Sequence, residues 1–162
     1  MIQTMLKRIK RMNRKNKKGF TLVELLLVIA IIAILAAIVI IAINPARQIA
    51  QANNAQRRVN INSILNGVNQ YMIDNRGTIP TSITTSSKYI CITGTSSTGC
   101  GGGADLAVIT NNELYLVSLP TDPTTAVGTS TGYLISKSTS SNPRVTVSAP
   151  GAELSETISV TR

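Results

Sequence analysis

One acidic residue, Glu24, lies inside a long apolar run that extends from Phe20 to Ile43 and contains no other charge. A carboxylate within a membrane-spanning segment costs about 2.5–3.5 kcal/mol on insertion scales, so Glu24 needs a cation at the same depth. Cleavage of the chain between Gly19 and Phe20 would create one, the free amine of Phe20, in the same chain or in a neighbouring one. The alternative is that Glu24 lies near the membrane edge, where it reaches water or is protonated.

The residues before this run are strongly basic. The chain carries 16 Lys and Arg against 7 Asp and Glu, a net charge of +9, and eight of the basic residues lie within residues 1–19. The remaining 8 basic and 7 acidic residues leave a body with a charge of +1. Because the positive charge is confined to one side of the apolar run, it indicates a cytoplasmic leader and not a nucleic-acid-binding surface. The run forms a helix of about 36 Å, enough to span a membrane and too long for a signal peptide.

The segment KKGFTLVELLLVIAIIAILAA closely resembles the amino-terminal signature of type IV pilins and of the pseudopilins of type II secretion. The resemblance covers about residues 17–40. It implies that a prepilin peptidase in the membrane cleaves after Gly19 and methylates the new amine of Phe20, and that Glu24 assists the docking of subunits. It also implies a single-pass membrane precursor with a cytoplasmic N-terminus, inner-membrane assembly machinery as a partner, and a mature homo-oligomeric helical filament at the cell surface.

An amphipathic helix is predicted over residues 44–77, continuous with the apolar run, so that one long helix extends from about Phe20 to about Asn75. Pro45 should introduce a kink or a local break, because it removes a backbone donor. The apolar residues that form one face recur at helical spacing and are Ile61, Ile64, Leu65, Val68 and Met72. Val59 and Ile49 extend this stripe less regularly, and Gly77 is suited to the C-terminal cap.

Three arginines, Arg47, Arg57 and Arg58, lie off this stripe and form a small basic cluster. We expect them to form a solvated helix face or to contact other subunits. Contact with nucleic acid is the alternative, since some pilus systems take up DNA.

Residues 78–162 are rich in Ser and Thr and poor in charge. Alternating apolar residues predict three antiparallel strands near residues 132–138, 143–149 and 156–161. The fold class is therefore α+β, pilin-like, with a long N-terminal helix packed on a small three-stranded antiparallel sheet. We therefore expect four segments. They are a cleaved leader at residues 1–19, a transmembrane or filament-core helix at 20–43, an amphipathic helix at 44–77 and a globular head at 78–162.

Two further positions bear on ligands and cross-links. An extracytoplasmic location favours a disulfide between Cys91 and Cys100, with free thiols or half of a metal site as alternatives. The stretch Leu119–Pro123 resembles a pseudopilin loop that can hold calcium, and Asp122 is its only carboxylate. Calcium usually takes 6–8 oxygens, so a role in the turn is favoured for Asp122 and calcium is the alternative. No other metal or cofactor is expected.

Enzyme chemistry finds little support. The chain has no His, no GxSxG motif, and no Lys-Ser or Lys-Thr after its glycine run at 101–103. We predict a structural subunit of a type IV pilus-like surface filament. The alternatives are a pseudopilin of a type II secretion system, a DNA-binding minor pilin, and a membrane-anchored binding module that does not polymerise.

Overall fold

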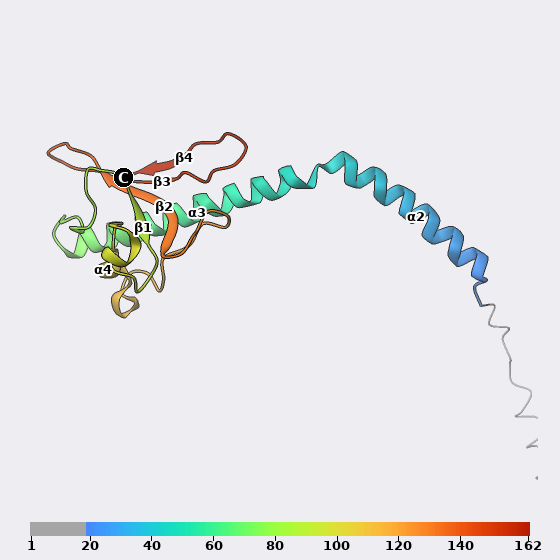
Figure 1. The fold of residues 1–162 in the computed structure, drawn as a ribbon, viewed down its shortest axis with the longest axis horizontal. Helices are drawn as coiled ribbons and strands as arrows, with labels where there is room; N and C mark the ends of the chain where they lie inside the picture. Colours follow the sequence, from blue (N-terminus) through green and yellow to red (C-terminus); the bar gives the residue numbers. More distant parts are fainter. Residues whose placement is uncertain (1–18) are drawn as a thin grey trace, which may run out of the picture. The chain divides into compact units, whose positions relative to one another are not determined.

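The computed structural model describes residues 19–162, so nearly all of the basic leader lies outside the described residues. The chain divides into two compact units, one ending at Asn44 and one from Pro45 to Arg162 (Figure 1). The first contains helix α2, Leu22–Ile43, in which no residue is buried. Its most apolar 18-residue stretch has a mean hydropathy of 3.6, and within residues 19–162 it is the one helix long and apolar enough to span a membrane.

Helix α3, Pro45–Asp74, opens the second unit. Asn44, between the two helices, has a left-handed backbone with φ of 49°. Pro45 suits the first position of a helix, because its missing N–H would have no helical acceptor there. The long helix expected from about Phe20 to about Asn75 is present as α2 and α3, and the local break expected near Pro45 lies at Asn44. The kink at Pro45 stays a prediction.

The second unit, which we call the head, contains a four-stranded antiparallel sheet in the order β1-β2-β3-β4. The strands are Lys88–Cys91, Ser130–Lys137, Val145–Ala149 and Ile158–Thr161. Short helical turns lie between β1 and β2: η1 at Thr98–Cys100, α4 at Ala107–Thr110 and η2 at Asn111–Glu113.

The expected α+β fold is confirmed, but the expected sheet of three strands is wrong, because β1 adds a fourth. Strand β1 has only four residues, and its pairing with β2 is irregular between Tyr89 and Cys91. Ile90 and Cys91 are both buried although they are adjacent, so the alternation that marks a strand in the sequence is missing.

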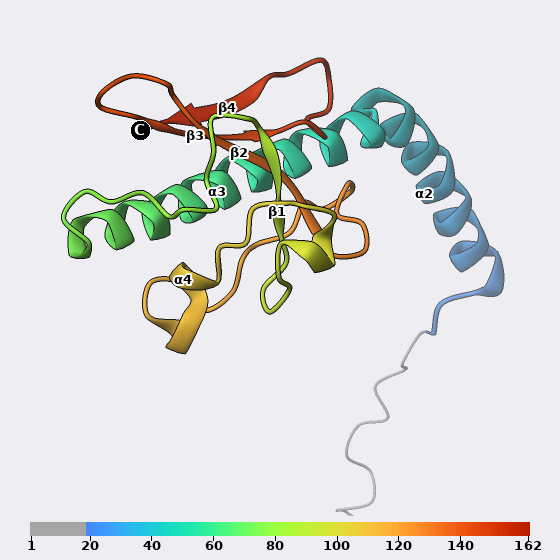
Figure 2. The same ribbon diagram turned by 60° about the vertical axis from the view of Figure 1, so that its left-hand side comes forward.

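The core of the head lies between α3 and the sheet, which run side by side in both views (Figures 1 and 2). Most of what α3 contributes to this core comes from the apolar face that the sequence predicts. Strand β3 supplies Val145, Val147 and Ala149, which alternate with more exposed residues. The fully buried apolar side chains that α3 contributes are Ile61, Ile64, Leu65 and Val68.

The N-terminal half of α3 buries a different face from the one expected. Val59 and Ile49 are 59% and 62% exposed, so the prediction that they extend the apolar stripe is wrong. The buried positions there are mainly polar and include Asn54, Arg57 and Asn60. They face two loops of the head that offer polar partners, so the buried face of α3 changes from polar to apolar along its length.

Candidate functional site

Helix α2 begins with a capping box formed by Thr21 and Glu24. The hydroxyl Oγ1 of Thr21 accepts the backbone N–H of Glu24 at 3.2 Å, and Oε2 of Glu24 accepts the backbone N–H of Thr21 at 3.4 Å. Two N–H groups that would otherwise lack partners at the helix start are thereby satisfied. The carboxylate also lies in the first turn, where the helix dipole favours negative charge. Glu24 therefore has a local structural role in its own chain.

The expected cleavage residues lie directly before this cap. Gly19 and Phe20 precede the helix in irregular backbone, and Phe20 is 79% exposed. An exposed segment without regular structure, next to a capped helix, is suited to entering the active site of a peptidase. If the chain were cut there, the new amine of Phe20 would lie four residues before Glu24. Cleavage and methylation at these residues stay predictions.

A second polar cluster lies in the head, where the guanidinium of Arg57 is shared between two loops. Its Nε and Nη2 donate to the two carboxylate oxygens of Asp122 at 2.8 and 3.1 Å. Its Nη1 donates to Oε2 of Glu153 at 2.8 Å and to Oδ1 of Asn54 at 2.9 Å. Nη2 also donates to the hydroxyl of Thr124. The side chains of Arg57 and Asp122 are completely buried, and that of Glu153 is 34% exposed.

Hydrogen bonding fixes the charges of this cluster. The hydrogen bond to Asp122 raises the pKa of Arg57 above its ordinary value, although burial opposes this. Burial by itself would raise the pKa of Asp122, but Arg57 and the backbone amides of Thr124 and Thr125 hold it well below its usual range. Hydrogen bonds from Arg57 and then Asn53 lower the pKa of Glu153. All three groups are thus charged at neutral pH.

The solvated position expected for the three arginines of α3 is wrong for Arg57, whereas Arg47 and Arg58 are exposed. Arg57 is buried and paired with Asp122 and Glu153. Arg58 is exposed but forms an ion pair with Glu156 at 2.6 Å. Two of the three arginines are neutralised within the head, so this cluster gives no support to a nucleic-acid site.

The residues around Asp122 do not suit calcium in the native chain. Both carboxylate oxygens accept from Arg57, and Oδ1 also accepts the backbone amides of Thr124 and Thr125 at 2.9 and 2.8 Å. A divalent cation would have to displace a buried guanidinium. Within residues 19–162 no group of three or more His, Cys, Asp or Glu side chains is arranged to hold a metal. The structure thus favours the reading of Asp122 as a turn residue.

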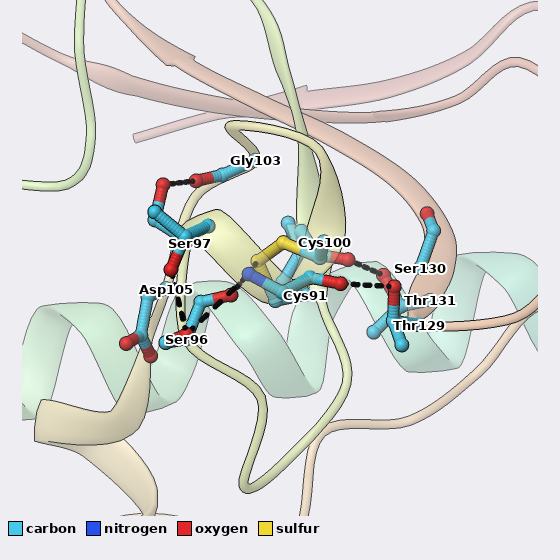
Figure 3. Close-up of a disulfide and its surroundings, with 12 residues drawn as sticks. Cys91, Ser96, Ser97, Cys100, Gly103, Asp105, Thr129, Ser130 and Thr131 are labelled. Carbon is cyan, nitrogen blue, oxygen red and sulfur yellow. Dashed lines mark hydrogen bonds between the residues drawn. A yellow bond between two sulfur atoms is a disulfide. The ribbon is translucent and has the colours of Figure 1, made fainter.

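Cys91 and Cys100 form a disulfide with a Cα–Cα distance of 5.6 Å, which leaves neither thiol free for a metal. Figure 3 shows the loop around it, in which the hydroxyl of Ser97 donates to the carbonyl of Gly103 at 2.7 Å. A Cβ atom on Gly103 would lie 2.6 Å from the carbonyl oxygen of Tyr89 and 2.7 Å from the sulfur of Cys100. The chain therefore packs onto the disulfide at a distance that only glycine permits.

Comparison with known protein families gives one match, to the amino-terminal segment. The family model of the prokaryotic N-terminal methylation motif matches residues 14–42. The chain carries the prepilin signature. Type IV pilins and pseudopilins share this signature, which implies processing by a prepilin peptidase. The matched residues contain Gly19, Phe20 and Glu24, together with almost all of α2. Comparisons with curated proteins and with solved structures gave no match.

Two features of these sites were not predicted from the sequence. The capping box was readable, because Thr and Glu three residues apart before an apolar run are its signature. The pairing of Arg57 with Asp122 had no local signal, since the two residues are 65 positions apart. An arginine beside a polar helix face is normally solvated, and only the folded loops provide its partners.

Proposed function

We propose that this chain is the structural subunit of a type IV pilus-like surface filament. It is made as a membrane-inserted precursor, cleaved after Gly19, methylated on Phe20 and polymerised through its N-terminal helix. The observation that carries the proposal is the coincidence of the prepilin signature with a helix that buries none of its residues within its own chain. Such a helix needs lipid first and neighbouring subunits later.

The energetics of α2 are compatible with a helix that lies first in lipid and later among the helices of neighbouring subunits. In lipid, association of helices gains little from hydrophobicity, because lipid tails are as apolar as leucine. After extraction from the membrane the same side chains gain about 25 cal/mol per Å² that neighbouring helices cover. The carboxylate of Glu24 is the exception, since it needs a cation when water is removed. The methylated amine of Phe20 in an adjacent subunit would supply that cation and set the axial position of each new subunit.

The capping box allows the charge of Glu24 to be tested separately from its structural role. Glu24→Gln removes the charge, while its side-chain oxygen can still accept the N–H of Thr21. Thr21→Ala removes the hydroxyl of the cap and keeps the charge. Losing one partner of a buried charge pair costs about 2–5 kcal/mol, a loss of subunit affinity of about 30-fold or more. We therefore expect Glu24→Gln to insert normally and to assemble poorly, and Thr21→Ala to assemble.

The assay compares membrane-inserted subunit with sheared surface filament by immunoblot. Normal filament yield from Glu24→Gln, together with loss of filaments from Thr21→Ala, would show that Glu24 acts only as a helix cap. That outcome would refute its role in docking. The pseudopilin alternative shares the signature, and it predicts failure of protein secretion without long surface filaments.

A further inference from the structure

The side chains around Arg57 have the composition of a cation-binding site, and the cation that they bind is the guanidinium of Arg57 itself. Five oxygens lie within hydrogen-bonding distance of one guanidinium, and they come from α3 and from two loops that are far apart in the chain. Only Asp122 and Glu153 among them carry charge. The five are Oδ1 and Oδ2 of Asp122, Oε2 of Glu153, Oδ1 of Asn54 and Oγ1 of Thr124. Carboxylate, amide and hydroxyl oxygens are also the ligands that calcium prefers.

This oxygen cluster holds the two loops onto the helix. Asn54 fixes the second loop through both backbone groups of Glu153, donating to its carbonyl at 2.8 Å and accepting its N–H at 2.9 Å. Asn60 fixes the first loop by donating to the carbonyl of Thr121 at 3.1 Å. Arg57 pairs with a carboxylate in each loop, so two carboxylates would face each other across the site without it.

A guanidinium suits this position better than other cations of the protein. Its planar fork donates to both oxygens of Asp122 and still has a third nitrogen for Glu153. It cannot lose its proton, and it is covalently attached, so it is present at every calcium concentration.

We propose that Arg57 is a built-in replacement for a metal ion. The head of the native chain needs no calcium to fix these loops, and removal of the arginine side chain leaves an oxygen cage that accepts one calcium ion. Asp122 and Glu153 would supply the charged ligands, and water would complete the coordination. This inference does not depend on the proposed function, because it concerns the head of the chain in any assembly state.

The test is calorimetry of the full-length chain in detergent micelles, with EDTA or with millimolar calcium chloride. We expect the unfolding temperature of the native head to be the same in both. Arg57→Ala should unfold at a lower temperature in EDTA. Calcium at about ten times its dissociation constant should then raise that temperature by about 4–8 °C, and titration should show one saturable site per chain.

Two controls separate this result from a general effect of charge. Arg58→Ala removes the same charge from the adjacent, exposed position and should show no response to calcium. Arg57→Ala combined with Asp122→Ala removes two cage oxygens and should lose the calcium response. The inference is overturned if the native head is stabilised by calcium. It is equally overturned if Arg57→Ala folds without binding calcium, or if it stays unfolded when calcium is present.

Discussion

Asp122→Asn is the substitution that most directly tests the buried ion cluster. The amide has the shape of the carboxylate but carries hydrogen atoms on one side. In either orientation these face a donor: Nε of Arg57 on one side, or Nη2 of Arg57 and the amides of Thr124 and Thr125 on the other. Arg57 keeps only Glu153 as a charged partner, and Glu153 is partly exposed.

Removing one partner of a buried ion pair costs about 3–5 kcal/mol. We expect a loss of about 3 kcal/mol for Asp122→Asn, because Glu153 and Asn54 still accept from Arg57. For a head that extends from Pro45 to Arg162, this corresponds to a fall in unfolding temperature of about 10–20 °C. Asp105→Asn is the matched control. Asp105 accepts one backbone N–H, that of Ala107 at 2.8 Å, and asparagine can do the same, so we expect a loss below about 1 kcal/mol.

The pH dependence of this loss of stability shows whether the charge of Asp122 is its cause. The pKa of Asp122 is held below its usual range in the folded head. Its stabilising effect is therefore fully present above the ordinary pKa of about 3.9 and is lost as the pH falls below that value. Asparagine does not titrate, so the stability difference between native chain and variant should shrink between about pH 4 and pH 2. Denaturant unfolding at several pH values measures this, and a small or pH-independent difference would refute the argument.

Three further substitutions test the packing of the head by denaturant unfolding. Ile64→Ala should cost about 2–5 kcal/mol because the side chain is fully buried, whereas Val59→Ala should change stability by less than about 0.5 kcal/mol; equal losses would contradict the assigned face of α3. Gly103→Val should destabilise by about 1–3 kcal/mol or more, because its Cβ would clash with the disulfide; native-like stability would show that the loop can move away. Replacing both Cys91 and Cys100 by serine should cost about 2.7 kcal/mol on the loop-entropy estimate, and an unchanged midpoint would show that the disulfide contributes nothing.

Features whose physical cause is local could be predicted from the sequence. The composition of residues 22–43, which are apolar except for Glu24, determines a helix whatever the rest of the chain does. The alternation of Val145, Val147 and Ala149 identifies β3, since one face of that strand is buried and the other is not. The disulfide followed from the compartment and from the presence of only two cysteines.

Features that depend on distant partners were predicted wrongly. Arg57 appeared to be a solvated surface residue, because Asp122 and Glu153 are 65 and 96 positions away. Val59 appeared to belong to the buried stripe, since helical spacing alone does not show that the head covers a polar face there. Strand β1 was missed because a bulge and a disulfide bury adjacent residues. In each case the deciding contact forms only in the folded head.

We propose that this chain becomes a filament subunit after cleavage at Gly19. The intact mass of the protein in filaments sheared from the surface of cells that produce it tests this proposal. We expect a chain that begins at Phe20, carries one added methyl group and continues to Arg162. A filament fraction that lacks this chain, or that contains it with residues 1–19 still attached, would refute the proposal.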